Sequence, residues 1–394
     1  MQVVLLAAGE GTRMRPLTTA LPKPMLPVAD RPLVAHNADA AVEAGASELI
    51  VVVGYESEAV REYFGESYRG VPVEYAVQNE QLGTAHAVDC AREYLDGPFA
   101  VLNGDDLYDT ESLTALLTAD GPTVGTYRVE DPTSYGVFEV ENGVVTGIVE
   151  KPDDPPTDLI NVGAYVFPAA AREWLDVPKS ERGEHEITDV LARVIAEQSV
   201  GTVEIDRWLG CGRPWELLEA NEWRLGELDR RIEGDVHPDA ELRGAVVVEE
   251  GATVDAGVVV EGPALIRTGA DVGPNTYVRG ATLLAENTHV GNGVEIKNSV
   301  VMAGTNVPHL SYVGDSVLGR EVNLGAGTNV ANLRHDGQPV KFTVKGERVS
   351  TGRRKFGVVA GDGVKTAINT SLSPGLRLSS GATTEPGESV TRDR

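Results

Sequence analysis

The stretch Val248–Val278, VEEGATVDAGVVVEGPALIRTGADVGPNTYV, decides the fold of the second half of this chain. Within it an aliphatic residue returns at every sixth position, and glycines stand in the polar gaps. The spacing extends on both sides of the stretch, through Val236, Leu242, Val248, Val254, Val260, Ile266, Val272, Val278, Leu284, Val290, Ile296 and Met302. A six-residue repeat predicts a parallel β-helix, in which each hexad forms one side of a coil and turns its apolar residue inward.

The phase of this repeat is interrupted twice. It slips at 306–310, and a second interruption spans about 335–355. Between the two breaks the predicted inward positions are Tyr312, Leu318, Leu324 and Val330. Insertions in a solenoid loop outward and often build its binding face. We therefore expect functional residues in both breaks.

The first half of the chain alternates strand and helix patterns. Short apolar runs predict buried strands, a helical pattern follows the first of them, and Pro214 opens a charged amphipathic helix. The strands are expected at 3–8, 49–53 and 99–102, and the helices at 32–44 and 214–231. This alternation predicts an α/β, Rossmann-like mixed sheet, largely parallel, with helices on both faces. The predicted domains are 1–231, ending in a linker helix at about 214–231, and 232–394.

Bulk composition narrows the partners. The 394 residues carry a net charge of −26, which argues against nucleic acid or an anionic membrane as a partner. Lysines are scarce beside arginines, and such an acidic surface is expected in a high-salt cytoplasm, where screening mutes self-repulsion. Two cysteines are too few for a disulfide framework, and no apolar run is long enough to span a membrane. We expect a cytoplasmic protein without a structural metal.

The segment 6–27, LAAGEGTRMRPLTTALPKPMLP, follows the first predicted strand. Its two glycines, Gly9 and Gly11, let the backbone approach an anion and aim N–H groups at it. Arg13, Arg15 and Lys23 add three cations. It is neither a P-loop nor a dinucleotide fingerprint, because the G-K-[ST] ending and the third glycine are absent. The segment predicts a triphosphate site.

The same segment resembles the sugar-1-phosphate nucleotidylyltransferases, whose hallmark is L-A-[AG]-G-x-G-T-R-[ML]-x-P-L-T followed by P-K-P. The resemblance implies transfer of a nucleotidyl group to a sugar-1-phosphate, with Arg13 on the β/γ phosphates and Lys23 neutralising the α-phosphate. It implies nucleotide contacts from Ala8, Gly9, Gly11, Thr12, Gln78, Gly83 and Thr84, a Mg²⁺ ligand in Asp105, and sugar-phosphate contacts from Gly136, Glu150, Lys151 and Asn161. The glutamine favours UTP or dTTP without choosing between them.

One position departs from that family. Its W-x-D-[IV]-G-x-P motif carries a second metal-binding aspartate, whereas Trp208-Leu209-Gly210 puts a glycine in that place. Asp206 or a water molecule is a candidate replacement. The departure predicts weaker metal binding or slower turnover.

The segment Pro308–Asp315 resembles the bifunctional N-acetylglucosamine-1-phosphate uridyltransferases, whose β-helix is left-handed and acetylates glucosamine-1-phosphate. The resemblance implies acetyl-CoA as co-substrate, His309 as general base and a homotrimer with the acyl site between subunits. It implies substrate or CoA contacts from Arg279, Lys297, Tyr312, Asn323, Ala326, Asn332, Lys341 and Ala367. The loop 332–337 departs from the bacterial N-Y-D-G and resembles the archaeal bifunctional type, so glucosamine and galactosamine phosphates both stay open.

Three hypotheses follow. The leading one is a bifunctional enzyme that N-acetylates an amino-sugar-1-phosphate and transfers UMP or dTMP to the sugar-1-phosphate, releasing pyrophosphate. The second is a glucose-1-phosphate uridylyl- or thymidylyltransferase with a structural β-helix. The third is an acetyltransferase with a weakened nucleotidyl site. His309 separates the first hypothesis from the second, because a structural β-helix needs no general base. Gly210 separates the first from the third, because it lacks the metal-binding side chain of the family motif.

Overall fold

The computed structural model describes residues 1–54, 57–180 and 182–394. The chain forms two compact units, the first made of 1–10, 22–25 and 32–210 and the second of 11–21, 26–31 and 211–394. The predicted boundary at 231 therefore differs from the division into units, which falls at Gly210/Cys211 and groups the linker helix with the β-helix. Two short segments from the first 31 residues also belong to the second unit.

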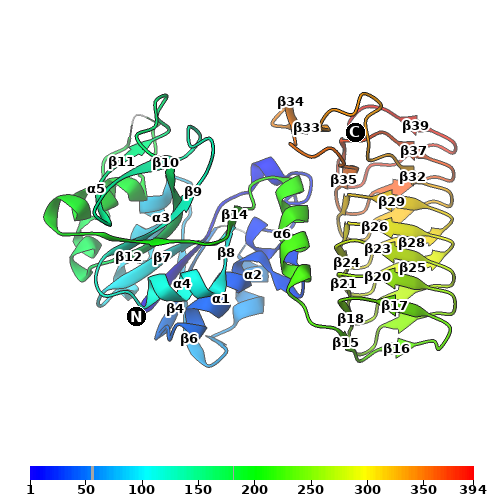
Figure 1. Ribbon diagram of the computed structural model, residues 1–394, viewed down its shortest axis with the longest axis horizontal. Helices are drawn as coiled ribbons and strands as arrows, with labels where there is room; N and C mark the ends of the chain where they lie inside the picture. The colour runs from blue at the N-terminus through cyan, green and yellow to red at the C-terminus, as the bar shows by residue number, and fades with distance from the viewer. Residues whose placement is uncertain (55–56, 181) are drawn as a thin grey trace. The chain divides into compact units, whose positions relative to one another are not determined.

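The first unit is built on a ten-stranded mixed sheet in the order β10-β11-β13-β9-β12-β7-β1-β4-β6-β5 (Figure 1). Strands β7, β1, β4 and β6 run parallel, and β12 joins this group antiparallel to β7. The strands are β1 Gln2–Ala7, β4 Glu48–Val53, β5 Ser67–Tyr68, β6 Val71–Val77, β7 Phe99–Asn103, β9 Thr123–Arg128, β10 Gly136–Glu141, β11 Val144–Glu150, β12 Leu159–Phe167 and β13 Gly201–Glu204. The predicted Rossmann-like mixed sheet is confirmed, but the expectation that it is largely parallel was wrong, because the pairs β10–β11, β11–β13, β9–β12, β7–β12 and β5–β6 are antiparallel.

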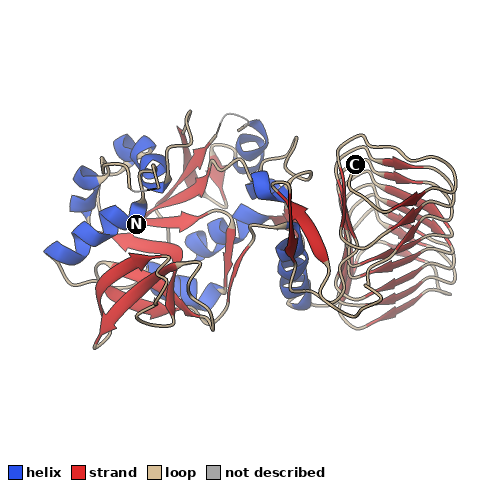
Figure 2. Cartoon of the chain, turned by 90° about the horizontal axis from the view of Figure 1, so that it is seen from above, coloured by secondary structure: helices blue, strands red, loops and turns tan. Residues whose placement is uncertain are grey.

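Helices cover both faces of this sheet (Figure 2). One apolar cluster includes buried residues of α1 and α4, and a separate cluster includes those of α3 and α5. The helices are α1 Leu33–Glu43, α2 Glu58–Phe64, α3 Thr84–Cys90, α4 Thr110–Leu117 and α5 Ile187–Glu197, with short 3₁₀ turns η2 Lys23–Met25, η3 Arg92–Tyr94 and η4 Ala169–Trp174. A two-stranded ladder, β8 Asp106–Tyr108 with β14 Trp208–Gly210, stands apart from the main sheet.

The second unit contains a parallel β-helix whose strands stack in three sheets, the arrangement of a left-handed β-helix (Figure 1). One sheet holds β15 Arg231–Ile232, β18 Val246–Val248, β21 Ala264–Ile266, β24 Thr282–Leu284, β27 Val300–Val301, β30 Val317–Leu318, β35 Val358–Ala360 and β38 Leu376–Leu378. The next holds β16 Asp235–Val236, β19 Thr253–Val254, β22 Asp271–Val272, β25 His289–Asn292, β28 Asn306–His309, β31 Asn323–Leu324 and β36 Lys365–Thr366. The third holds β17 Glu241–Arg243, β20 Val259–Glu261, β23 Tyr277–Arg279, β26 Glu295–Lys297, β29 Tyr312–Gly314, β32 Asn329–Val330, β37 Ser371–Leu372 and β39 Ser389–Val390.

The inward positions follow the predicted six-residue spacing up to Ile296 and then shift. After Ile296 the core continues with Val301, Val307 and Val313, so Met302 and Tyr312 were wrongly predicted to face inward in the repeat. The register explains the shift. Ile266 pairs with Leu284, eighteen residues later, whereas Leu284 pairs with Val301, only seventeen residues later. One side of this coil is therefore one residue shorter. The predicted slip at 306–310 was also wrong, since 306–309 form strand β28 within its sheet.

The linker helix is shorter than predicted. Helix α6 spans Pro214–Gly226, with Pro214 at its start, and the chain then enters β15 at Arg231. Its Trp215 forms edge-to-face contacts with Phe342 and Phe356, two buried rings of the β-helix region in the same unit. The helix therefore ends before β15, the first strand of the β-helix.

The second interruption of the repeat is an excursion from the coils. Between β32 and β35 the chain forms the antiparallel hairpin β33 Lys341–Val344 and β34 Glu347–Ser350, which projects from the stack in Figure 1. Among the described residues, no helix has the length and apolarity needed to cross a membrane. Both cysteines, Cys90 and Cys211, are free thiols.

Candidate active sites in the two units

Two loops of the first unit begin where neighbouring parallel strands end. Strand β1 ends at Ala7 and β7 at Asn103, with Leu6 and Asn103 paired in register. The Gly104 N–H donates to the Leu6 carbonyl at 2.9 Å, which fixes the start of the Gly104–Asp105 turn. The carboxyl ends of parallel strands are where α/β sheets bind ligands. Ala8, Gly9 and Asp105 thus share one edge of the sheet.

Lys23 and Asp105, predicted to act on phosphate and metal, form an ion pair. The Lys23 side chain is only 6% exposed, whereas that of Asp105 is 39% exposed. Burying an ammonium group is costly unless a carboxylate lies beside it. The contact with Asp105 therefore stabilises the buried side chain of Lys23. The Asp105 carboxylate is partly open to solvent.

Asp106 and Trp208 lie beside Gly210, the position at which the family motif carries its second metal-binding aspartate. Gly210 pairs with Asp106 across the β8–β14 ladder, and a Cβ at Gly210 would lie 3.2 Å from Asp106 Oδ1 and 3.2 Å from the Trp208 ring. Burial and the charge of Asp105 raise the pKa of Asp106, whose Oδ2 accepts from Asn103 Nδ2 at 3.1 Å. A larger residue at 210 would have to displace these groups.

The predicted base-reading segment packs against another part of the first unit. Gln78 is buried, and its Nε2 lies 3.1 Å from the Gly83 carbonyl and 3.0 Å from His86 Nδ1. Gly83 has φ +121°, and a Cβ there would overlap the backbone of His185. Thr84 Oγ1 accepts from the Ile187 N–H at 3.0 Å. The glycine is therefore required by the 183–189 segment.

Gln81 joins this segment to the first loop. Its Nε2 donates to the Ala8 carbonyl at 2.8 Å. The partner is a backbone atom that only the fold brings near. The contact fixes the loop that follows β1.

The remaining nucleotide residues, Gly11, Thr12 and Arg13, belong to the second unit. Gly11 has φ +61° and precedes the 3₁₀ turn η1 Thr12–Met14, so its backbone requires the left-handed conformation that glycine favours. Arg13 is exposed, and its guanidinium lies beside Gly212, where a Cβ would be 3.3 Å from the nearer nitrogen. The structure thus leaves the Arg13 side chain accessible.

The predicted sugar-phosphate residues come together on β10, β11 and β12. Gly136 pairs with Glu150, and a Cβ at Gly136 would lie 2.8 Å from Glu150 Oε2 and 3.5 Å from Asn161 Cβ. Asn161 Nδ2 donates to the Tyr165 hydroxyl at 2.7 Å. Lys151 Nζ lies 4.0 Å from Glu150 Oε1. Gly136 is needed because these side chains fill its face.

Arg182 is a further cation at this cluster that sequence reasoning did not single out. Its guanidinium pairs with Glu150 at 2.9 Å and with Glu186 at 2.7 Å. The Arg182 hydrogen bond, opposed by burial, lowers the pKa of Glu186. Nothing in the local sequence relates residues 150 and 182, so only the fold reveals this pair.

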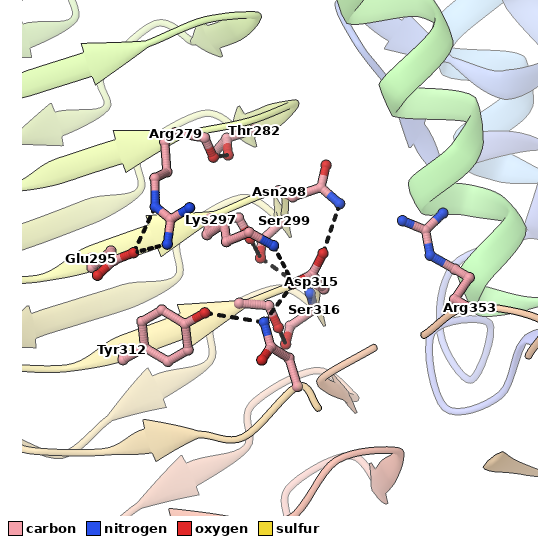
Figure 3. Close-up of polar contacts among 12 residues, drawn as sticks. Arg279, Thr282, Glu295, Lys297, Asn298, Ser299, Tyr312, Asp315, Ser316 and Arg353 are labelled. Carbon is pink, nitrogen blue, oxygen red and sulfur yellow. Dashed lines mark hydrogen bonds and ion pairs between the residues drawn. The ribbon is translucent and has the colours of Figure 1, made fainter. Parts of the chain in front are cut away.

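In the second unit, the predicted acetyl-acceptor residues stack on successive coils of one sheet (Figure 3). Arg279, Lys297 and Gly314 occupy one row of the register. Arg279 pairs with Glu295 at 2.7 Å, and Asn332 Nδ2 donates to the Tyr312 hydroxyl at 3.1 Å. Each cation of the row is paired with a carboxylate, Arg279 with Glu295 and Lys297 with Asp315.

His309 is exposed and ends β28, at the corner that leads into β29. Asn323 lies on β31, one coil further along the same sheet as β28. His309, the predicted general base, and the Arg279–Lys297 row therefore belong to different sheets of the β-helix. Ala326 lies at a half-buried corner beyond β31, and Lys341 is exposed on the hairpin.

Two features of this second cluster alter the sequence interpretation. The Ala367 N–H donates to Thr384 Oγ1 at 2.9 Å and its carbonyl accepts from Thr370, so the coil uses the backbone groups proposed for CoA. Asp315, quoted within the motif but given no role, accepts hydrogen bonds from Lys297 and Asn332. A signal was present in the sequence, because Asp315 closes the quoted segment Pro308–Asp315.

Comparison with known families gives one match in each half of the chain. Residues 2–225 match the family described as Nucleotidyl transferase, and residues 260–364 match the GMPPB C-terminal domain. A solved UDP-glucose pyrophosphorylase complexed with UDP-glucose superposes with a TM-score of 0.52 at 27% identity, covering 57% of this chain and 98% of that one. The class is a nucleotidyl transferase that carries a C-terminal β-helix.

Relatives over almost the full length narrow the class. The chain is 41% identical to the Bifunctional protein GlmU of Methanococcus vannielii, over 96% of this chain and 92% of that protein. It is 35% identical to the Bifunctional sugar-1-phosphate nucleotidylyltransferase/acetyltransferase of Sulfurisphaera tokodaii, over 100% and 98%. The Low-salt glycan biosynthesis nucleotidyltransferase Agl11 of Haloferax volcanii is 34% identical over 82% and 94%. The chain belongs to the family of bifunctional nucleotidylyltransferase/acetyltransferases.

Proposed function

We propose that this protein acetylates an amino-sugar-1-phosphate on its β-helix and transfers a nucleotidyl group to a sugar-1-phosphate in its first unit. The observation that carries the proposal is the pair of separate polar clusters, Lys23 with Asp105 in one unit and Lys297 with Asn332 in the other. A structural β-helix has no need of the second cluster. The bifunctional names of full-length relatives support the same reading.

In the nucleotidyl step, a phosphate oxygen of the sugar-1-phosphate attacks the α-phosphorus of the nucleoside triphosphate, and pyrophosphate leaves. Such a transfer needs neutralised charge and in-line positioning more than a protein nucleophile. Lys23 would neutralise the α-phosphate, Arg13 would contact the β/γ phosphates, and Glu150 with Asn161 would bind sugar hydroxyls. The UDP-glucose in the solved relative makes UTP the first nucleotide to test, with dTTP as the alternative.

Asp105 would hold Mg²⁺ in this site. Among the described residues, no three His, Cys, Asp or Glu side chains form a metal site of their own. Mg²⁺ is usually held by one or two carboxylates together with substrate phosphates and water. The ion would supply charge neutralisation on the phosphates. Gly210 offers no ligand, and the space beside it is occupied by Asp106 and Trp208.

In the acetyl step, the amine of the amino-sugar-1-phosphate attacks the thioester carbonyl of acetyl-CoA, an amide bond forms, and the CoA thiol leaves. His309 would take the amine proton, as histidine side chains commonly do in general base catalysis. Arg279 and Lys297 would bind the sugar phosphate, and Tyr312, Asn323 and Asn332 the sugar or donor. Lys341 would also contact the sugar phosphate, and Ala326 and Ala367 are the remaining proposed substrate or CoA contacts.

A homotrimer through the β-helix would complete the acetyl site. The placement of His309 and of the Arg279–Lys297 row on different sheets supports a site to which two copies contribute. Cross-linking and sedimentation of the full chain test this assembly. We propose a cytoplasmic location for the enzyme, where UTP and acetyl-CoA are available.

The decisive experiment measures both activities in high salt, with UTP or dTTP against glucose-, glucosamine- and galactosamine-1-phosphates and their N-acetyl forms. Acetyl transfer is followed by thiol release, and nucleotidyl transfer by pyrophosphate release with Mg²⁺ present. His309→Ala should lower thiol release about 10²- to 10⁴-fold and leave pyrophosphate release unchanged. His237→Ala, at an exposed histidine of the first coil, is the matched control.

Each part of the proposal has an outcome against it. Unchanged acetylation in His309→Ala would remove the proposed base. Wild-type protein that releases pyrophosphate but no thiol would leave only the nucleotidyltransferase. Thiol release without pyrophosphate release would indicate that Gly210 marks a lost first site.

A further inference from the structure

One corner of the β-helix carries a carboxylate that the backbone does not require. The register aligns Arg243, Glu261, Arg279, Lys297 and Gly314 in one row, so the corner residues that follow them also form a row. These corner residues are Gly244, Gly262, Gly280, Asn298 and Asp315. Four of them, all but Gly262, have φ between +46° and +74°. Glycine, asparagine and aspartate all adopt that conformation, so the backbone alone does not require the charge of Asp315.

The Asp315 carboxylate is the acceptor at the centre of a polar cluster (Figure 3). Its side chain is 4% exposed. Oδ2 accepts from Lys297 Nζ at 2.6 Å and from Asn332 Nδ2 at 2.5 Å, and Oδ1 accepts from Asn298 Nδ2 at 3.0 Å. An ionised carboxylate provides about four lone-pair sites and no donor. It is the side chain best able to satisfy three donors at once.

Two of the three donors are the groups proposed to hold the acceptor substrate. The Lys297 side chain is 14% exposed, so its ammonium is largely withdrawn from water and needs a counter-charge nearby. An ammonium has three donors, and the contact with Asp315 leaves others to meet a phosphate. Asn332 is held from two sides, by Asp315 and by the Tyr312 hydroxyl. The carboxylate therefore sets the direction of both side chains.

The third donor links this cluster to helix α6 of the same unit. Asn298 Nδ2 also donates to Glu222 Oε1 at 2.8 Å, so the two hydrogens of one amide nitrogen meet two carboxylates. Glu222 in turn pairs with Arg353 at 3.2 Å, and Arg353 reaches Glu219 at 3.3 Å. Figure 3 shows Arg353 beside the green helix α6. The support of Asp315 thus includes a helix that precedes the β-helix in sequence.

We propose that Asp315 is the positioning residue of the acetyl-acceptor site, holding Lys297 and Asn332 toward the phosphate of an amino-sugar-1-phosphate. Glu222 on α6 fixes the carboxylate through Asn298. The inference rests on the proposed acetyl transfer, because it assumes that the Arg279–Lys297 row binds the amino-sugar-1-phosphate. It makes α6 part of the support of the acceptor site.

Asp315→Asn tests the charge with little change of shape, since Asn298 shows that asparagine adopts this corner. The amide offers one acceptor oxygen to three donors and turns an NH₂ toward them. We expect the dissociation constant for glucosamine-1-phosphate, measured by calorimetry on the full chain, to rise about tenfold or more. The KM for acetyl-CoA and the rate of pyrophosphate release should stay at their wild-type values. Wild-type affinity for the sugar phosphate in this variant would overturn the inference.

A double-mutant cycle separates positioning from general loss of structure. In a Lys297→Met background, the ammonium group that Asp315 positions is already absent. The further effect of Asp315→Asn on sugar-phosphate binding should therefore shrink to about threefold or less. A purely structural role would give the same loss in both backgrounds. Equal losses would therefore also refute the proposal.

Asn298→Gly is the second variant, should Asp315→Asn fail to fold. Glycine occupies the same corner one coil earlier at Gly280, so the backbone accepts the change, while the Asn298 amide that bridges Asp315 and Glu222 is lost. We expect weaker sugar-phosphate binding by about threefold. Asn287→Gly, at another left-handed corner of the β-helix, is the matched control. Equal binding by the two variants would refute the role of Asn298.

These tests distinguish failure of the inference from failure of the proposed function. Acetylation by wild-type protein together with undisturbed binding in the variants overturns only the role of Asp315. Wild-type protein that neither binds glucosamine-1-phosphate nor releases thiol from acetyl-CoA overturns the acetyl function, and the inference with it.

Discussion

Gly104→Ala tests whether the turn after β7 must approach β1 as closely as the structure shows. An ideal Cβ at Gly104 would lie 2.5 Å from the Leu6 carbonyl oxygen, 3.1 Å from the Leu6 carbonyl carbon and 3.3 Å from Val34 Cγ2. The first two atoms are backbone atoms of the central strand β1, so no side-chain rotation relieves the overlap. An ordinary contact begins at 3.4 Å, so the turn must move by about 0.9 Å, the difference between 3.4 and 2.5 Å.

That movement acts directly on the proposed metal ligand. It breaks or lengthens the bond from the Gly104 N–H to the Leu6 carbonyl, and the next residue is Asp105, the partner of Lys23. A misplacement of about 1 Å in a catalytic arrangement lowers rates by about 10²-fold. We expect kcat/KM for pyrophosphate release to fall by about that factor and the apparent Mg²⁺ affinity to weaken. Thiol release from acetyl-CoA, a reaction of the other unit, should be unchanged.

Gly97→Ala is the matched control, because it makes the same chemical change before the start of β7, where a Cβ meets nothing within 4 Å. Both variants are assayed over a Mg²⁺ titration at a temperature well below their unfolding midpoints, so that lost stability is not read as lost activity. If Gly104→Ala released pyrophosphate with the kcat/KM of Gly97→Ala, the close approach of the turn to β1 would be irrelevant to catalysis. The assigned geometry of Asp105 would then be wrong.

Three further predictions concern stability and metal dependence. Ile296→Ala removes a fully buried side chain from the β-helix core and should lower the free energy of unfolding by about 2–5 kcal/mol in urea titrations. Because the folded pKa of Glu186 is lowered, its stabilising contribution is present above its unfolded pKa and is lost as the pH falls through the folded value. Glu186→Gln should therefore be less stable than wild type by about 1 kcal/mol at pH 7, and the difference should close in acid denaturation. Chelation with EDTA should abolish pyrophosphate release and spare thiol release; equal loss of both would contradict the assignment of Mg²⁺ to the nucleotidyl site alone.

Repetition made most of the second unit readable from sequence. Six-residue spacing identifies a β-helix because each coil repeats the same steric problem, an apolar residue turned inward at each side. The same regularity failed after Ile296, where a side loses one residue and Val301 replaces Met302 in the core. A periodic pattern with a one-residue deletion permits several phases, and only the pairing of Leu284 with Val301 selects the phase that the protein uses.

In the first unit, the sequence motifs identified candidate residues, but they did not give the structural reason for each of them. Gly83 was singled out as a close approach to a base, yet the backbone of His185 lies where its Cβ would be. Arg182 was not singled out, and it pairs with Glu150 from a segment 32 residues away in sequence. Contacts of this range depend on how strands order in the sheet, which local pattern does not encode.

The sequence by itself determined the two fold classes and the residue types of both candidate sites, because periodicity and local motifs are properties of neighbouring residues. Only the tertiary structure decided which of those residues share a carboxylate, a corner or a strand end. Asp315 illustrates the difference: its charge is visible in the sequence, but its three donors come from residues 297, 298 and 332. Successive coils bring them together, because stacking places positions about seventeen residues apart next to one another.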